Sequence, residues 1–168
     1  MRNLFVSAFT ANLALLAVSY AMLPGCVALH FGSGGTPDSW GSKQAYVGVF
    51  LGVVIAIFAL FSALPVLLRK VPGSMRRHPY RDYWTKAANR AELDRRNARH
   101  LLEFGAVSLA FLFWAEFLCL LAHTADPVRL NEPMLILGLA VFLLYTVYFS
   151  VKPIWMYRPP KVSSEKSS

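Results

Sequence analysis

Two glutamates within long apolar stretches are the first residues of this sequence whose chemistry needs an explanation. Glu103 lies at the edge of its stretch beside basic residues, and we expect a structural role for it. Glu116 would lie about 9 Å inside the far end of the same apolar helix. Because an ionised carboxyl in hydrocarbon costs ~2.5 kcal/mol or more, we expect Glu116 to face a bundle interior or a wet cavity. It is then either a functional acid or a neutral group bonded to Tyr20 or Tyr145.

Cysteine and histidine form a second pattern, in which the two members of each pair are four positions apart. Cys26 is followed by His30, and Cys119 is followed by His123. Residues four apart share one face of a helix, and both pairs lie near the same end of their apolar stretches. Thiolate and imidazole are preferred ligands of zinc and copper, so neighbouring helices would create a metal site here. The alternative is coincidence, with both cysteines buried as small apolar side chains.

Motifs of common enzyme and cofactor sites are missing from the sequence. It contains no Walker-type phosphate loop, no HExxH, no GxSxG and no Rossmann glycine run. No stretch is long enough to form a soluble domain that houses such a site. We therefore expect a protein that is not an enzyme and that needs no cofactor.

Four long apolar stretches must position these residues. The chain has 168 residues, of which 56% are hydrophobic and 15% are charged, whereas about 25% are charged in a typical soluble domain. A helix of roughly 20 apolar residues crosses a bilayer core about 30 Å thick, and lipid leaves unpaired backbone groups unsatisfied. The sequence predicts an all-α integral membrane fold with four transmembrane helices, at about residues 4–29, 46–68, 101–122 and 134–151.

The four spans are predicted to form one membrane domain over residues 1–158, followed by a disordered tail over residues 159–168. The first span also resembles a secretory signal peptide, because Arg2 precedes its apolar core and Ser19-Tyr20-Ala21 is similar to a cleavage site. The apolar run continues past that site and is long enough to span a bilayer. We therefore favour a membrane helix.

Basic residues are distributed unequally between the connections. Fifteen of the seventeen lie before the first span, between spans two and three, or after the last span, while the other connections hold only Lys43 and Arg129. Lys and Arg accumulate on the cytoplasmic side of membrane proteins, so both termini and the middle loop are predicted to be cytoplasmic. The net charge of +8 is thereby explained by membrane orientation, and we expect no binding of nucleic acid.

The predicted cytoplasmic loop is basic and favours a helix over residues 82–99. Its alanines and arginines have high helix propensity, and Glu92 and Arg96 form a favourable pair four residues apart. This helix can run directly into the third span. Anionic lipids are the expected partners of the loop, at about 1 kcal/mol per basic residue. The alternative is a docking surface for a soluble regulator.

The connection between the first two spans carries the most specific motif, LPGCVALHFGSGGTPDSWGSK over residues 23–43. Pro24 ends or kinks the first helix, and the glycines with Pro37 favour a compact, turn-rich loop. The motif closely resembles that of a widespread bacterial membrane domain of unknown function, which also forms the N-terminal part of SdpI-type immunity proteins. The residues that carry the resemblance are Leu23, Pro24, His30, Phe31, Gly35, Pro37, Asp38, Trp40, Ser42 and Lys43.

A second resemblance follows the second span. The segment from His78 to Trp84, HPYRDYW, is similar to the N-P-x-x-x-Y-W segment of that family. The family usually continues with a Pro-Glu-Arg element, whereas the segment from Thr85 to Arg90 here reads TKAANR, so no role of that element carries over. Better-studied relatives protect cells against membrane-active peptide toxins and pass a signal to a repressor. They also carry a further membrane domain that these 168 residues lack.

The resemblance implies a multi-pass protein of the bacterial inner membrane that acts by binding, as an immunity or signalling component of the envelope. Expected partners are the bilayer and either a peptide toxin or another membrane protein, with a second copy of the chain as a further candidate. We expect the ligand to bind an outer surface formed by His30, Asp38, Trp40 and Lys43. Two alternatives stay open: a small ion-coupled transporter subunit centred on Glu116, and an outer-face metal-binding protein that uses Cys26, His30, Cys119 and His123.

Overall fold

The computed structural model describes residues 1–71, 80–84 and 86–159. Four helices within these ranges are long and apolar enough to cross a membrane, as the sequence predicts. They are α1 (Arg2–Met22), α2 (Lys43–Lys70), α4 (Ala87–Ala122) and α5 (Glu132–Val151), and the short helices α3 (Arg81–Trp84) and α6 (Pro153–Met156) lie beside them in the sequence. Several residues of the sequence predictions lie outside the described ranges: Arg76, Arg77, His78, Pro79, Thr85, and the tail beyond residue 159 with Lys161 and Lys166.

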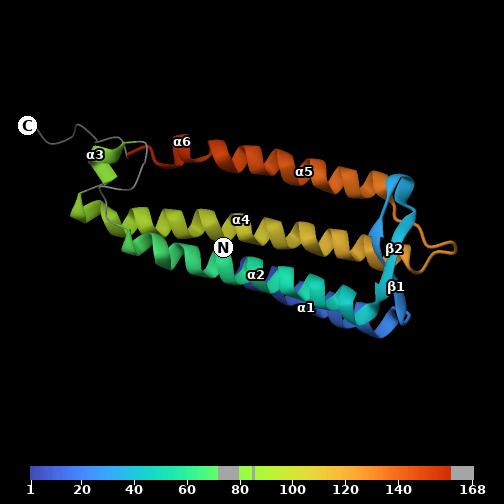
Figure 1. Cartoon of the computed structure of the whole chain (residues 1–168). Coiled ribbons are helices and arrows are strands. Elements are labelled where there is room, and N and C mark those ends of the chain that lie inside the picture. Colours follow the sequence, from blue (N-terminus) through green and yellow to red (C-terminus); the bar gives the residue numbers. More distant parts are fainter. Residues whose placement is uncertain (72–79, 85, 160–168) are drawn as a thin grey trace, which may run out of the picture.

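Helices α1, α2 and α4 pack together, and α5 lies along the other side of α4 (Figure 1). Gly105 of α4 marks the point where the three helices meet. A Cβ atom at this position would lie 2.8 Å from ring atoms of both Phe5 in α1 and Phe61 in α2. Phe5 also stacks on Phe58 of α2, with ring centroids 4.9 Å apart. Small residues at such crossings allow close helix packing, which matters in lipid because no hydrophobic effect drives helices together there.

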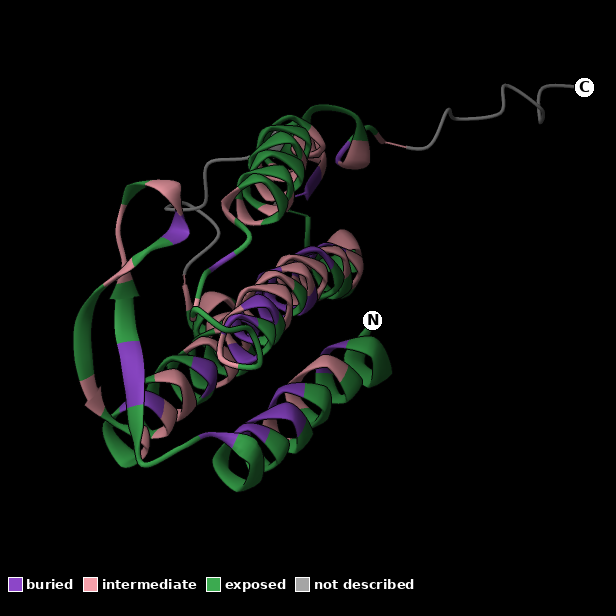
Figure 2. Cartoon of the chain, turned by 90° about the vertical axis from the view of Figure 1, so that its right-hand side faces the viewer, coloured by how far each residue is buried: buried purple, intermediate pink, exposed green. Residues whose placement is uncertain are grey.

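Helix α5 is attached more loosely. It contains no buried residue, and Figure 2 shows burial concentrated on the other long helices. It approaches α4 closely at Gly138, where a Cβ atom would lie 2.4 Å from the Trp114 indole. The Trp114 indole N–H also donates to the Met134 carbonyl at 3.2 Å. Most of the apolar surface of α5 is therefore exposed.

The first span is shorter than predicted, because α1 ends at Met22 and does not reach Leu29. Leu23, which follows it, has an extended backbone (φ −69°, ψ 142°), as expected for the residue before a proline. The apolar run after Pro24 continues as a strand in which Val27 and Ala28 are buried against the end of the bundle. The predicted boundary is wrong because a short apolar run has no period that separates a strand from a helix.

A β-hairpin replaces the irregular loop predicted between the first two spans. Strand β1 (Cys26–Phe31) pairs antiparallel with β2 (Pro37–Ser42), and the 3₁₀ turn η1 (Ser33–Gly35) joins them. The hairpin crosses the end of the helices (Figure 1). The Ser42 hydroxyl accepts a hydrogen bond from the Ala45 N–H and caps the start of α2.

The hairpin turn interlocks with the connection between α4 and α5. The Gly35 carbonyl accepts from the Leu130 N–H at 2.8 Å, and the Gly34 N–H donates to the Glu132 carboxylate at 2.8 Å. Arg129 in turn donates to the Gly34 carbonyl at 2.9 Å. Both glycines have positive φ, 76° and 73°, which glycine adopts without steric cost. We call the hairpin (residues 26–42) and this connection (residues 123–131) together the hairpin cap.

The opposite end is held by a group of buried side chains, the Trp84 cluster (Trp84, Leu93 and Tyr157). The Trp84 indole N–H donates to the Tyr157 carbonyl at 2.8 Å, and the Arg96 guanidinium lies over the indole ring. The Tyr157 hydroxyl donates to the Asn97 side chain, and burial raises the pKa of this phenol, which therefore stays a neutral donor. The loop helix runs unbroken into the third span, as the sequence suggested, although it begins at Ala87.

Candidate functional site

Glu116 lies fully buried between α1 and α4, with 0% of its surface exposed. Its Oε1 accepts from the Ser19 hydroxyl of α1 at 3.0 Å, and its Oε2 has no hydrogen-bond partner in the described ranges. The partners suggested from the sequence are wrong. Tyr20 is exposed, and Tyr145 donates to Glu103 at 3.0 Å. The burial of Glu116 follows from the cost of a carboxyl in lipid, but its partner depends on which face of α1 meets α4.

Asn12, Ser19 and Glu116 form a row of buried polar side chains along the contact of α1 with α4, which we call the polar seam. Asn12 is seven residues before Ser19, and residues so spaced share one helix face. Its Nδ2 donates to the carbonyls of Ala8 at 2.8 Å and Leu109 at 3.0 Å, while its Oδ1 is buried without a partner in the described ranges. Sequence reasoning missed Asn12 and Ser19, although two polar residues seven apart in an apolar span were the available signal.

The seam can take up a proton, a water molecule or a small cation. Buried oxygens without partners are costly, and two such oxygens, Asn12 Oδ1 and Glu116 Oε2, face the same pair of helices. Toward the hairpin cap lies Tyr46, which is also buried. Its hydroxyl bonds to no nitrogen or oxygen of a described residue and lies beside the Cys119 thiol.

His123 joins the hairpin to α4. Its Nε2 accepts from the Ala28 backbone N–H at 2.9 Å, so its Nδ1 carries the proton and donates to the Cys119 carbonyl at 2.7 Å. Both ring nitrogens therefore have partners in the protein. His123 serves as a structural link, which leaves neither nitrogen free to bind a metal.

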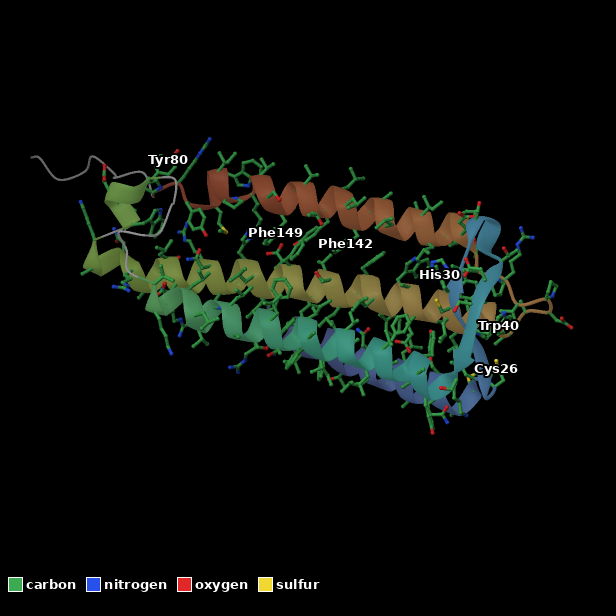
Figure 3. The ribbon with its side chains drawn as sticks, viewed as in Figure 1. Cys26, His30, Trp40, Tyr80, Phe142 and Phe149 are labelled. Carbon is green, nitrogen blue, oxygen red and sulfur yellow. The ribbon has the colours of Figure 1, made fainter. Side chains whose placement is uncertain are left out.

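The structure does not bring the predicted metal ligands together. Cys26 and His30 lie on a strand, so the helical spacing that would place them on one face does not apply. Figure 3 shows both on the hairpin, and Cys26 is exposed there. Within the part of the chain that the structure describes, no group of three or more His, Cys, Asp or Glu side chains is placed to hold a metal. The prediction is wrong because Pro24 and Gly25 end the helix before Cys26.

Three of the four predicted ligand-binding residues lie on the surface of the hairpin. His30 Nδ1 and Asp38 Oδ1 are 2.6 Å apart and form an exposed pair across the two strands. Trp40 on β2 is 51% exposed (Figure 3). Lys43 has a different place, because its Nζ donates to the carbonyls of Tyr20 at 3.1 Å and Leu23 at 3.4 Å. A cation at the C-terminal end of a helix is stabilising, so Lys43 anchors the hairpin to α1.

Glu103 has a structural role at the other end of α4. Both of its oxygens bond to Lys152 Nζ, at 2.6 and 2.7 Å, and the Tyr145 hydroxyl is a third donor. Next to it, the His100 ring stacks on Phe149, with centroids 3.7 Å apart. These contacts join α4 to the C-terminal part of α5.

Together, the four apolar helices, the buried polar seam and the hairpin cap define a helical membrane protein with a structured cap at one end. Residues 8–57 match the family model described as Domain of unknown function (DUF1648). This match confirms the resemblance of the first motif to a domain of unknown function. The match covers most of α1, the whole hairpin and the first half of α2. No curated protein and no solved structure matches the chain.

Proposed function

We propose that the protein is a multi-pass protein of the bacterial inner membrane that acts by binding at its hairpin cap, as an immunity or signalling component of the envelope. One observation carries the proposal. The family match is centred on the hairpin, which displays His30, Asp38 and Trp40 at its surface. The resemblance to SdpI-type immunity proteins supports a membrane-active peptide or another membrane protein as the ligand. The proposal assigns no catalytic step.

The hairpin suits such a role because it is rigid before a ligand arrives. Lys43 fixes it to α1, His123 fixes it to α4, and the bonds of Gly34 and Gly35 fix its turn. A preorganised surface loses less entropy on binding. An exposed tryptophan supplies a large apolar anchor of the kind that dominates interface energies.

Replacing Trp40 with alanine is expected to weaken ligand binding by about tenfold or more, as loss of an aromatic anchor does. Because Trp40 is exposed, the free energy of unfolding should change by no more than ~0.5 kcal/mol. The measurement is the inhibitory concentration of envelope-active peptides for cells that carry the variant, the deletion or the unchanged gene. Trp155→Ala, an exposed tryptophan at the opposite end, is the control. Unchanged sensitivity of the deletion strain across the peptide panel would contradict the proposal.

We further propose that the hairpin cap faces the outside and that both termini are cytoplasmic. The asymmetry of basic residues supports this orientation, because the connections at the hairpin end hold only Lys43 and Arg129. Residues 69–99 and 152–168 hold fourteen of the other fifteen. Figure 1 places α3, α6 and the C-terminal end of α2 at the end opposite to the hairpin.

Labelling of Cys26 tests the orientation. Cys26 is exposed on β1, whereas Cys119 is partly buried. A membrane-impermeant maleimide is expected to label spheroplasts that express the protein, and Cys26→Ser should abolish the labelling while Cys119→Ser preserves it. Labelling of inside-out vesicles but not of spheroplasts would show the reverse orientation.

A second candidate function, an ion-coupled subunit, is favoured by the buried carboxyl of Glu116 with its unpartnered oxygen. Glu116→Gln preserves the size of the side chain and the hydrogen bond to Ser19 but has no proton to exchange. It is expected to abolish proton flux in proteoliposomes, whereas Ser19→Ala retains the acid and should retain flux. Equal flux through the unchanged protein, Glu116→Gln and empty vesicles would exclude this candidate.

A further inference from the structure

An apolar groove of about 410 Å³ lies between α4 and α5. Its lining includes Val107, Ala110 and Trp114 of α4 and Leu137, Val141 and Tyr145 of α5. Its surface is almost wholly apolar, and no side chain from α1 or α2 lines it. The groove thus lies where the loosely attached helix meets the bundle.

A second hollow of about 480 Å³ lies further along α4, where Met1 and the segment after α5 also line it, and many of its side chains are charged. Three cationic side chains line it, Arg96, Arg99 and Lys152, and two carboxylates accompany them. Each carboxylate already has a cationic partner: Glu103 is paired with Lys152, and Glu92 with both Arg95 and Arg96. Arg99 forms no ion pair within the described ranges, so the hollow retains positive charge.

The two hollows adjoin and together form one groove, because the hydroxyl of Tyr145, which lines the apolar hollow, donates at 3.0 Å to Glu103, which lines the polar one. The lining of both hollows includes a series of α4 residues that are three or four positions apart, which places this series on one helix face. On the other side, Leu137, Val141 and Tyr145 of α5 are four positions apart, and Lys152, just after the end of α5, is seven positions further on. The α4 face, in order from the polar to the apolar end, is formed by Arg96, Arg99, Glu103, Val107, Ala110 and Trp114.

The length of the apolar part fits one leaflet of a bilayer. From Glu103 to Trp114 the helix rises about 16 Å, which is close to half of a hydrocarbon core of about 30 Å. Trp114 ends the groove, because its indole lies against Gly138. A transmembrane helix of a partner would need a surface along the full thickness, whereas an acyl chain needs only one leaflet.

We propose that this groove binds one anionic phospholipid. Its phosphate would lie between Arg99 and Lys152, and an acyl chain would fill the apolar part as far as Trp114. The charge at one end and the apolar lining along the rest match the two halves of such a molecule. The lipid would add contacts to α5, which buries none of its own residues. This site is independent of the ligand proposed for the hairpin cap.

Native mass spectrometry of the detergent-purified full chain tests the polar half. We expect one bound phosphatidylglycerol per chain at lipid concentrations that leave no phosphatidylcholine bound. Arg99→Gln should weaken retention about fivefold, the factor that corresponds to one basic residue near a lipid surface. Arg95→Gln is the matched control, because Arg95 belongs to the same helical segment but does not line the hollow.

A second set of variants tests whether an acyl chain occupies the apolar part of the groove. Ala110→Phe and Val107→Phe are each expected to remove the bound lipid by filling the groove, whereas Leu144→Phe, on the exposed side of α5, should retain it. Circular dichroism shows whether each variant is folded. Equal retention of phosphatidylglycerol and phosphatidylcholine by the unchanged protein would overturn the proposal without any variant. So would equal effects of Arg99→Gln and Arg95→Gln, or a dimer that Ala110→Phe dissociates.

Discussion

Replacing Gly35 with alanine is expected to detach the hairpin turn and to lower the free energy of unfolding by about 3 kcal/mol. Gly35 has a φ of 73°, which a residue with a Cβ atom adopts only under strain. An added Cβ atom would lie 2.1 Å from the Leu130 carbonyl oxygen, and backbone atoms cannot yield as a flexible side chain can. The turn must therefore move away, and the hydrogen bond between Leu130 and Gly35 is lost with it.

Two other glycines separate the causes of this effect. Gly34 also has a positive φ, but the atom nearest to an added Cβ there is the end of the flexible Arg129 side chain, at 3.7 Å. Gly34→Ala should therefore introduce only backbone strain and lower the free energy of unfolding by about 1 kcal/mol. Gly25 has nothing within 4 Å of an added Cβ atom, so Gly25→Ala should change stability by no more than ~0.5 kcal/mol. Thermal unfolding in mild detergent measures the series, and equal losses for Gly25→Ala and Gly35→Ala would refute the explanation.

The Gly35 variant also bears on function, because it disturbs the docking of the hairpin without touching His30, Asp38 or Trp40. If binding requires a preorganised hairpin, Gly35→Ala should sensitise cells to the peptide ligand as Trp40→Ala does. Limited proteolysis of residues 26–42 would show whether the hairpin has been released. A released hairpin with undiminished protection would mean that its rigidity is not needed.

The four spans could be predicted because each is a long apolar run, and only a helix satisfies the backbone over that length in lipid. The hairpin could not, since the run from Val27 to Phe31 is too short to distinguish a strand from a helix by its period. The error in the metal site follows directly from this point. Cys26 and His30 are ligands on one face only if the helix continues, and Pro24 ends it.

The polar seam could be predicted only in part, because the sequence indicates which residue is buried but not which side chain it contacts. The cost of a carboxyl in hydrocarbon correctly indicates that Glu116 is buried. Its partner depends on the rotation of α1 against α4, which a single sequence does not specify. Ser19 faces α4 and bonds to Glu116, whereas the neighbouring Tyr20 points away and lies under the Lys43 ammonium group. One position along a helix changes the direction of a side chain by about 100°.

Replacing Trp84 with alanine is expected to lower the free energy of unfolding by about 3–5 kcal/mol, the usual loss for a buried tryptophan. Trp84 is 2% exposed, and truncation would leave a cavity beside Leu93 and Tyr157. It would also remove the donor to the Tyr157 carbonyl and the ring beneath Arg96. The loss should be measurable by thermal unfolding followed by circular dichroism in mild detergent.

The reason this effect should reach beyond its own cluster is the weak attachment of α5. That helix buries no residue of its own, so it depends on contacts at its ends and along α4. Tyr157, a member of the Trp84 cluster, lies just after α6, which follows the C-terminal end of α5. Trp84→Ala should therefore also increase proteolysis at residues 152–158. Trp84→Phe retains an aromatic ring but no donor, and its loss should be smaller. Trp155→Ala, at a tryptophan of α6 that is 48% exposed, controls for removal of an indole at the same end of the protein. If Trp155→Ala destabilised the protein as much as Trp84→Ala, burial in the Trp84 cluster would not be what holds this end together.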